Sequence, residues 1–519
     1  MQTPYLLFFS AVLVYVIKLY FDFRRQLKAI GNLPGYRTIF SATNPIANFS
    51  PPIPGVLPGR KYLSYSEHKD FDRLGYDIFT IVNILPQPSV SFNIADAEAI
   101  KHITSARARW PKPVELYSIL RIFGGNIVAS EDEEWKRHRK VANPAFSERN
   151  NRMVWEETVN IVNGMFDTAW KDKTIIEVDH CVDITMPLAL LVIGRAGFGR
   201  SVSWENDQKI PPGHKMSFKE ALHIVSTEIV WKVSVPEWAM RFTQKLRTIK
   251  LAFEEIQIYM QEMIDERRNA ERKVERYDLF SSLLDASEEG EDGSTKLTDT
   301  ELRGDVFIFM LAGHETTAHT LAFCFGMLAL YQNEQEILYQ HIMTILADGR
   351  QPTYEDMNLL TYCTAVFYET LRLIPPVIVV PKVSAEDTSL VFPSSAGERR
   401  VVIIPKGSHI ALDITGLHYN PKYWKDPQEF RPKRFLEEYN RDAFLPFSSG
   451  ARSCLGRRFF ECEGIAILTK IVQKYKIEIM EEPRFAHETF DERRARILSR
   501  TNGITTTPTR VPLVFRRRN

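Results

Sequence analysis

The sequence predicts a mainly α-helical protein with a minor share of β-strand and a long central helix, and its length allows one large domain or two or three smaller ones. Apolar residues recur at helical spacing through most of residues 90–380. Strand-like runs are short and late, at residues 401–405 (VVIIP) and 511–515 (VPLVF). Residues 302–330 are apolar on nearly every face, which is typical of a helix buried inside a domain.

The overall composition is that of an ordinary globular protein and excludes some function classes. The chain has 519 residues, of which 44% are hydrophobic and 25% charged, and its formal net charge is +1. This balance gives no indication of nucleic-acid binding. The five cysteines are few and scattered, so they do not predict a disulfide framework and suit a reducing compartment, where one could serve as a thiolate.

The N-terminus departs from this average. Residues 5–20 are apolar except for Ser10 and Lys18, and three basic residues follow at positions 24–28. The run is slightly shorter than the roughly 20 residues of a spanning helix, but Lys18 can extend its amine to the membrane surface. A cleaved signal would place its positive charge first and a small-residue cleavage site afterwards, and neither is present. We expect a retained single-pass anchor with the body in the cytosol; the alternative is a buried core helix.

Two segments that contain several proline and glycine residues follow the apolar run. The segments GNLPGY and SPPIPGVLPG cannot continue a helix. We therefore expect three parts: an anchor over residues 1–25, a hinge over residues 26–60, and the main domain over residues 61–519.

The stretch LAGHETTAHT, residues 311–320, superficially resembles the zinc-binding helix of a metalloprotease. In that motif the histidines stand four residues apart and reach one metal. Here His314 and His319 stand five apart, so at about 100° per residue they diverge by about 140°. The zinc interpretation fails on geometry. Polar groups in so apolar a helix are costly unless they are satisfied or functional, so Glu315 and Thr316 need another explanation.

A second informative stretch is PFSSGARSCLGRRFFECEG, residues 446–464. Its cysteine lies where a helix is expected to begin, and unpaired N–H groups at a helix N-terminus lower a thiol pKa. A lone cysteine is more often an inert core residue, but here it is part of a longer pattern. That pattern is Phe447, Gly450, Arg452, Cys454 and Gly456.

The pattern Phe-x-x-Gly-x-Arg-x-Cys-x-Gly resembles the haem-binding loop of the cytochrome P450 haem-thiolate monooxygenases, and the chain looks like their membrane-anchored fungal members. The resemblance implies the P450 fold and haem b, with Cys454 as the axial iron ligand. It also implies that Arg452 pairs with a haem propionate and that Phe447 packs beside the sulfur.

Other motifs extend the resemblance along the chain. In EWKRHRK, the family pattern implies that Trp135 and Arg139 meet a propionate. In YETLR and FRPKRF, it implies a structural network of Glu369, Arg372 and Arg434. A bare Glu-Arg pair would more often be a surface ion pair.

Two further features of these segments bear on partners and on the haem. Val379 stands where many members carry a further propionate-binding arginine, which leaves Lys382 or His409 as possible partners of that propionate.

Five basic residues are expected either to form a patch that binds an acidic electron-donor protein or to be ordinary solvent-exposed surface. The five are Lys136, Arg137, Lys140, Arg457 and Arg458.

With a haem beside it, AGHETT resembles the family's oxygen-activation motif. Ala312 and Gly313 are expected to leave room for dioxygen. Thr316 is expected to hydrogen bond in the oxygen site, and Glu315 to relay protons from solvent. For His314 a core position is the simpler interpretation.

The resemblance implies a monooxygenase that inserts one oxygen atom from O2 into a hydrophobic substrate, with NADPH-derived electrons delivered by a cytochrome P450 reductase or cytochrome b5. It implies the cytosolic face of the endoplasmic reticulum membrane and a terpenoid or other secondary metabolite as substrate. Alternatives are a reductase-independent isomerase or dehydratase, or a non-catalytic haem sensor. The expected substrate pocket is apolar. Its candidate residues are Tyr117, Leu120, Phe123, Phe307, Met310, Val377, Val379, Val380 and Ile504.

Overall fold

The computed structural model describes most of the chain, which folds into two compact units. The described residues are 3–41, 53–57, 67–199, 210–269, 278–288, 296–393 and 399–518. Unit 1 comprises Met1–Pro113, Leu371–Glu429 and Glu438–Cys454, and unit 2 comprises Val114–Thr370, Phe430–Glu437 and Leu455–Asn519.

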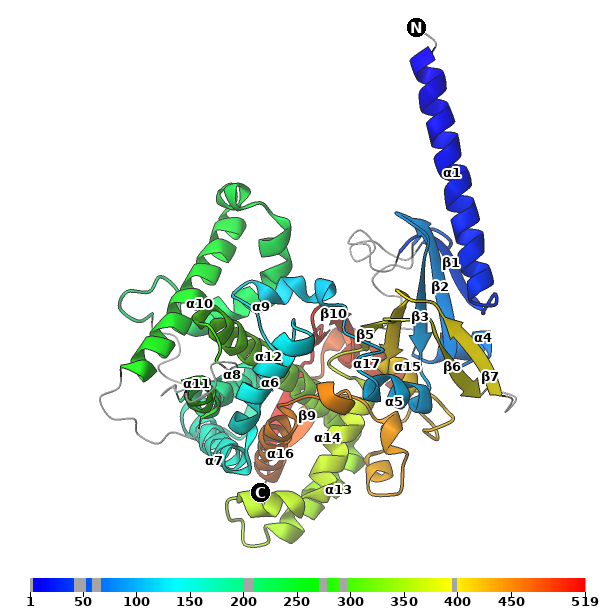
Figure 1. Cartoon of the computed structure of the whole chain (residues 1–519). Coiled ribbons are helices and arrows are strands. Elements are labelled where there is room, and N and C mark those ends of the chain that lie inside the picture. The colour runs from blue at the N-terminus through cyan, green and yellow to red at the C-terminus, as the bar shows by residue number, and fades with distance from the viewer. Residues whose placement is uncertain are drawn as a thin grey trace. The chain divides into compact units, whose positions relative to one another are not determined.

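Unit 1 is built on a five-stranded mixed sheet with the strand order β1-β2-β3-β8-β5 (Figure 1). The β1/β2 and β3/β8 pairs are parallel, whereas β2/β3 and β5/β8 are antiparallel. Strands β6 and β7 form a separate antiparallel pair. The strands are β1 (Gly35–Phe40), β2 (Ile78–Leu85), β3 (Ser89–Ile94), β5 (Val379–Val383), β6 (Thr388–Pro393), β7 (Arg399–Ile404) and β8 (His409–Asp413). The helices are α1 (Thr3–Ala29), α4 (Lys69–Leu74), α5 (Ala97–Ser105) and α15 (Ile414–His418).

The early strands were not expected, because the sequence indicated strand mainly near the C-terminus. Strand β2 is buried along six of its eight residues, so it lacks the alternation of apolar and polar residues that marks a half-buried strand. Strand β1 occupies part of the expected hinge, and residues 42–52 and 58–60 of that hinge lie outside the described residues.

The N-terminal apolar run forms helix α1, drawn in blue in Figure 1, with most of its large apolar side chains exposed. Among the described residues, however, no helix combines the length and apolarity needed to cross a membrane. The predicted transmembrane anchor is therefore not supported. After Lys18 the same helix carries three more charged residues, Asp22, Arg24 and Arg25, within about two turns.

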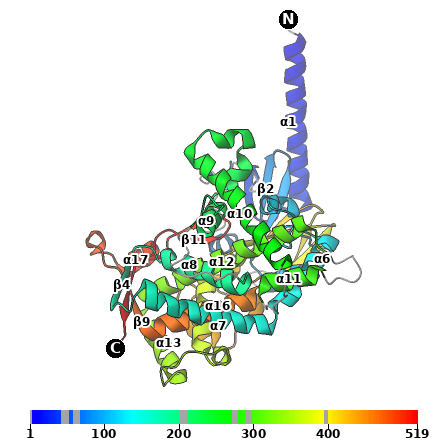
Figure 2. The same cartoon turned by 90° about the vertical axis from the view of Figure 1, so that its left-hand side faces the viewer.

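Unit 2 holds most of the helices. Figure 2 shows α7, α8 and α16 around α12, and α12 packs directly on α8 and α16. Its sheets are the three-stranded β4-β12-β9 and the hairpin β10-β11. The helices are α6 (Asp132–Ala142), α7 (Glu148–Gly164), α8 (Val182–Val192), α9 (Phe218–Ser234), α10 (Gln244–Arg268), α11 (Leu279–Glu288), α12 (Asp299–Leu330), α13 (Gln332–Ile345), α14 (Thr361–Leu373, whose last residues belong to unit 1), α16 (Arg457–Lys474) and α17 (Phe490–Ile497). The strands are β4 (Ile175–Val178), β9 (Tyr475–Ile479), β10 (Arg500–Asn502), β11 (Thr506–Pro508) and β12 (Leu513–Arg517).

Helix α12 confirms the predicted central helix and explains its start. Thr298 and Glu301 form a reciprocal capping box that satisfies N–H groups of the first turn. The helix runs from Asp299 to Leu330, and almost all of its residues after the first turn are buried. Late strand and abundant helix are also as predicted, since residues 401–404 lie in β7 and residues 513–515 in β12.

Candidate functional site

The loop that carries Cys454 closes on itself through its backbone. The N–H of Cys454 donates a hydrogen bond to the carbonyl oxygen of Phe447 at 2.8 Å. Gly450 lies between them with φ of +69°, and a Cβ atom there would lie 2.3 Å from the carbonyl oxygen of Thr104. Only glycine fits this combination of backbone angle and close approach. The loop therefore needs Gly450 for its shape.

Cys454 differs from the other cysteines in exposure. Its side chain is exposed, whereas Cys181, Cys324, Cys363 and Cys462 are buried. Burial raises the pKa of Cys324, Cys363 and Cys462 to about 12, and that of Cys181 further. These four are inert core thiols, which leaves Cys454 as the sulfur able to bind a ligand.

The start of the same loop is held by a buried histidine that the sequence analysis did not single out. The backbone N–H of Leu445 donates to Nε2 of His418 at 2.9 Å. On α14, the Arg372 guanidinium binds the carbonyl oxygens of His418, Pro427 and Glu429 at 2.9, 2.9 and 3.1 Å. The residues before the cysteine loop are thus fixed by side-chain contacts rather than by regular structure.

The predicted Glu-Arg-Arg network appears in part within unit 2. Nε of Arg434 donates to Glu369 at 3.0 Å, and the backbone N–H of Arg431 donates to the same carboxylate oxygen at 2.9 Å. Glu369 is fully buried and Arg434 is 5% exposed, so this is a buried ion pair. The contacts described above for Arg372 are to backbone carbonyls of unit 1.

On α12, a narrow, partly exposed stripe interrupts an otherwise buried surface. From Gly304 to Ala329 every residue is buried except Phe309, Ala312, Gly313 and Thr316. These positions follow the i, i+3, i+4, i+7 spacing of one helical face. The predicted oxygen-activation residues Ala312, Gly313 and Thr316 therefore share the open face of the helix.

The geometry of this stripe explains its small residues. A Cβ atom at Gly313 would lie 3.1 Å from Cδ1 of Ile193, the residue after α8, so a larger residue here would require the Ile193 side chain to shift by a few tenths of an ångström. The Thr316 hydroxyl donates to the carbonyl oxygen of Ala312 at 2.8 Å. Its oxygen lone pairs remain available to accept a hydrogen bond on the exposed face.

Glu315 lies off this stripe, in the interior. Its side chain is 7% exposed, and burial raises its pKa to about 7, with a hydrogen bond from Thr505 acting in the opposite direction. A carboxyl with this pKa exchanges protons readily near neutral pH, as a proton donor requires. His314 is buried, its Nδ1 lies 2.7 Å from the carbonyl oxygen of Met310, and burial lowers its pKa to about 4, which agrees with a core role.

Helix α6 carries Trp135, which is 7% exposed, and Arg139, which is partly exposed, on one face. Next to them His138 contacts Asp305 of α12 through Nδ1 at 2.6 Å, and both side chains are completely buried. Arg137 pairs with Glu301. Arg137 is therefore committed to the α6–α12 contact and is not part of a free basic patch.

The expected pocket residues divide among several elements. In unit 2, the rings of Phe123 and Phe307 lie 4.6 Å apart, and Met310 is fully buried. Tyr117 and Leu120 lie on the 3₁₀ helix at Val114–Arg121, and Ile504, which is 39% exposed, lies in the turn between β10 and β11. In unit 1, Val379 and Val380 lie on β5 and are half-buried, and Val377 is 39% exposed just before it.

These residues fit the haem that the resemblance implies. An exposed soft sulfur on a glycine-shaped loop is a suitable ligand for haem iron, and a stripe of small residues on a buried apolar helix suits a flat, largely apolar ring. Arg452 lies two residues before Cys454 in the same loop, and Arg139 lies on α6. Both supply guanidinium cations of the kind that pair with the carboxylates of a haem.

Comparisons with known proteins agree with this assignment. The family model described as Cytochrome P450 matches residues 50–504. "Cytochrome P450 monooxygenase 124" of Postia placenta is 52% identical over 520 residues, covering 100% of both chains. "Cytochrome P450 monooxygenase ORF6" of Penicillium roqueforti is 29% identical over 449 residues, covering 78% of this chain and 76% of the relative.

Solved structures show the same fold. The "cytochrome P450DA heme domain" superimposes with a TM-score of 0.72 at 20% identity, covering 94% of this chain and 98% of the other. A zebra fish cytochrome P450 solved with progesterone gives a TM-score of 0.68 at 21% identity, covering 87% and 98%. Family model and close relative together establish that the chain belongs to the cytochrome P450 family, oxidoreductases that use a cysteine-ligated haem to incorporate oxygen from O2.

Proposed function

We propose that this P450 monooxygenase oxidises a lipophilic small molecule, such as a terpenoid or another secondary metabolite, with electrons from NADPH. The observation that carries the proposal is the partly exposed stripe of Ala312, Gly313 and Thr316 on the otherwise buried α12, with Glu315 directly beside it in sequence. The aromatic pair Phe123 and Phe307 supports an apolar substrate.

The haem, when bound, supplies reductive activation of dioxygen and transfer of one oxygen atom to a C–H bond, with the second atom leaving as water. Cys454 is the residue that would hold its iron. Arg452, Trp135 and Arg139 would hold its propionates, and Phe447, Gly450 and Gly456 would shape the loop around the sulfur. Glu369, Arg372 and Arg434 are structural, since each is engaged in buried protein contacts.

Glu315 and Thr316 would handle protons. Burial places the pKa of Glu315 near 7, so the carboxyl can release a proton and regain one during each turnover at neutral pH. The Thr316 hydroxyl, anchored on the Ala312 carbonyl, would accept a hydrogen bond on the open face and hold a water there for proton transfer. Oxygen insertion needs this proton supply, whereas the isomerase and sensor alternatives do not.

We also propose that α1 attaches the enzyme to the cytosolic face of the endoplasmic reticulum membrane. Its exposed side chains include Leu7, Phe8, Phe9, Leu13 and Phe21, which would be stabilised by contact with lipid. A lipid surface would also concentrate a lipophilic substrate and would bring the enzyme close to an NADPH-dependent reductase, with cytochrome b5 as a second donor.

The test is the carbon monoxide difference spectrum of the reduced full chain, followed by turnover with reductase. We expect the strongly red-shifted Soret band of a thiolate-ligated haem, and its loss in Cys454→Ala. Thr316→Ala should keep that band but consume NADPH while releasing hydrogen peroxide instead of product. An unshifted haem band in the wild type would refute thiolate ligation. Tight coupling in Thr316→Ala would refute the proton role.

A further inference from the structure

Two pairs of side chains that the proposed reaction does not use meet between α6 and α12. On α6, Glu134 and His138 stand four residues apart, so they share one face of the helix. Glu301 and Asp305 have the same spacing on α12. One ligand atom from each of Glu134, His138 and Glu301 lies within 4.8 Å of the other two. All four residues belong to unit 2. The two helices therefore bring an imidazole and two glutamate carboxylates to one point.

His138 is the buried member of this group. Its side chain is completely buried, and its Nδ1 lies 2.6 Å from Oδ2 of Asp305, which is also completely buried. Its Nε2 has no hydrogen-bond partner and lies 3.9 Å from Oε1 of Glu301, which is too far for a hydrogen bond. Among the described residues, this is the only buried histidine nitrogen without a hydrogen-bond partner. Buried polar atoms are normally hydrogen bonded or bind an ion, so Nε2 is a candidate ligand atom.

The two glutamates of this group lie against one glycine. A Cβ atom at Gly125 would lie 3.0 Å from Oε1 of Glu134 and 3.6 Å from Cγ of Glu301, so both side chains pack on the same residue. The Glu134 side chain is 33% exposed and the Glu301 side chain is 15% exposed. The group is therefore accessible from solvent past Glu134, whereas His138 lies on its inner side.

The carboxylates of this group outnumber its arginines. Arg121 binds Glu134 at 2.8 Å and Arg137 binds Glu301 at 2.5 Å, whereas the side chain of Asp305 contacts a histidine. With a neutral histidine ring, the group carries one excess negative charge. Each carboxylate oxygen has two lone pairs, so an arginine contact does not exclude a metal ion on the same carboxylate.

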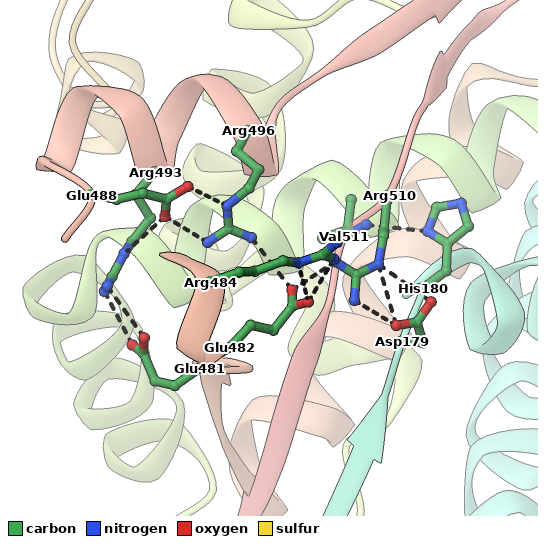
Figure 3. A network of polar contacts seen from close by, with 10 residues as sticks. All are labelled: Asp179, His180, Glu481, Glu482, Arg484, Glu488, Arg493, Arg496, Arg510 and Val511. Atoms are coloured by element: carbon green, nitrogen blue, oxygen red, sulfur yellow. Dashed lines mark hydrogen bonds and ion pairs between the residues drawn. The ribbon is translucent and has the colours of Figure 1, made fainter. Parts of the chain in front are cut away.

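The charged network near the C-terminus, also in unit 2, is balanced by comparison (Figure 3). It matches four carboxylates with four arginines, and Nδ1 of its histidine, His180, accepts the backbone N–H of Val511 at 3.3 Å. The carboxylates are those of Asp179, Glu481, Glu482 and Glu488, and the arginines are Arg484, Arg493, Arg496 and Arg510. That network needs no further ion, whereas the group between α6 and α12 would be neutralised by one more positive charge.

The chemistry of the ligand atoms selects the class of ion. An imidazole nitrogen together with two carboxylates suits Zn²⁺, whereas Mg²⁺ and Ca²⁺ favour oxygen ligands alone. In a tetrahedral zinc site with bonds of about 2.1 Å, neighbouring ligand atoms lie about 3.4 Å apart. The ligand atoms here would need to approach one another by no more than about 1.4 Å, which rotation of the partly exposed Glu134 side chain can supply.

We propose that Glu134, His138 and Glu301 form a binding site for a divalent transition-metal ion, and that Zn²⁺ is the ion it favours. Asp305 is a positioning residue, because its contact with Nδ1 orients the ring and keeps the lone pair of the neutral imidazole on Nε2. A water molecule would be the fourth ligand, on the solvent side. The bound ion would join α6 to the first turn of α12 and so stabilise α6, the helix that also carries Arg139.

The test is zinc binding by the purified, untagged full-length enzyme with its haem bound. Equilibrium dialysis against zinc chloride, with the zinc content measured by mass spectrometry, should give one tightly bound ion per chain that excess Mg²⁺ does not displace. X-ray absorption at the zinc edge should show an imidazole and only nitrogen and oxygen ligands, at about 2.0–2.2 Å. Zinc bound by a cysteine such as Cys454 would instead show sulfur at about 2.3 Å.

Variants then assign the ion to these residues. Glu134→Gln and His138→Gln should each weaken zinc binding by at least about tenfold, and Asp305→Asn by about ten- to a hundredfold because the ring loses its orientation. Glu133→Gln is the matched control, since its side chain lies on the same helix, is 85% exposed and is not a proposed ligand, and it should bind zinc as the wild type does. Glu134→Gln changes a partly exposed residue, so it tests the site even where the change at the buried His138 prevents folding.

Several results would overturn the site. These are the absence of a tightly bound ion in the wild type, sulfur among the zinc ligands, and equal binding by the wild type and Glu134→Gln, which would place the ion elsewhere. Unchanged binding in Asp305→Asn would overturn the positioning role of Asp305. The proposed oxidation is tested separately by the carbon monoxide spectrum and by turnover, so neither proposal stands or falls with the other.

Discussion

The backbone N–H of Leu445 donates to Nε2 of His418 at 2.9 Å, while Nδ1 of the same ring lies 3.1 Å from the carbonyl oxygen of Arg372. A ring whose Nε2 accepts must carry its proton on Nδ1, so His418 is a neutral donor to Arg372. Burial lowers its pKa to about 3, which keeps it neutral throughout the physiological range. One imidazole therefore joins the end of α14 to the first residue before the cysteine loop.

Replacing His418 by alanine should weaken haem retention. The change removes the acceptor of the Leu445 N–H and a donor to the Arg372 carbonyl, and a buried hydrogen bond lost in this way costs about 1–3 kcal/mol. We expect a lower haem-to-protein ratio after purification and a lower Tm, with partial recovery in His418→Gln. A full haem complement and an unchanged Tm in His418→Ala would show that the ring does not support the loop.

Cysteine labelling provides a direct check of which sulfur can act. In the folded apoprotein, a maleimide probe at neutral pH should attach once per chain, at Cys454, because the other four thiols are buried. Haem loading should protect Cys454, and Cys454→Ser should abolish labelling. Intact mass spectrometry counts the labels; a second label on the folded chain would contradict the burial of the core thiols.

Glu463 on α16 should make the stability of the fold decrease as the pH rises above the pKa of an unfolded glutamate. Its carboxyl is completely buried, Oε2 accepts from Thr317 at 3.3 Å, and burial raises its pKa well above the usual value. The folded state therefore holds a proton that the unfolded chain loses near pH 4.3. This contribution to stability is complete below that pH and falls by about 1.4 kcal/mol per pH unit until the folded pKa is reached.

The matching variant is Glu463→Gln, which cannot ionise. Urea unfolding of both proteins between pH 5 and about 9 should show a steeper loss of stability for the wild type. Parallel curves for the two proteins would mean that Glu463 is not protonated in the folded state.

Gly304 on α12 is expected to tolerate no side chain. A Cβ atom there would lie 2.1 Å from the carbonyl oxygen of Gly125, which is backbone and cannot turn away. Gly304→Ala should cost at least about 1–3 kcal/mol and displace the loop that carries Phe123. Gly326→Ala is the control on the same helix, because its nearest neighbours, Val511 and Ile497, are side chains at 3.2 and 3.3 Å. Equal thermal shifts in the two variants would refute the backbone clash.

Sequence patterns predicted the parts of this enzyme that are local in the chain. The apolar residues on nearly every face of residues 302–330 predicted the buried helix α12. The motif from Phe447 to Gly456 indicated Cys454, the cysteine that the structure leaves exposed. The family and the helix-rich fold followed from the same stretches. Spacing alone also excluded a zinc site at His314 and His319, which the structure places in separate buried contacts.

Contacts between distant residues could not be predicted. Thr505 lies 186 residues after His319, and nothing in its neighbourhood distinguishes it from the other threonines of TTTPT. His418 carries no motif, and its role appears only when Leu445 folds against it. A membrane span over the apolar run of α1 is not supported in the described residues, and the helix continues past Lys18 through charged residues to Ala29.

Arg372 has a consequence for the dynamics of unit 1. Its guanidinium binds three carbonyl oxygens of residues 418–429 and lies over the rings of Tyr419 and Trp424 at 5.8 and 5.4 Å. Residues 419–429 contain no helix or strand, so their amides would ordinarily exchange with solvent quickly. Pinned to one buried cation, they should instead open only together with the end of α14, as part of the same cooperative unit.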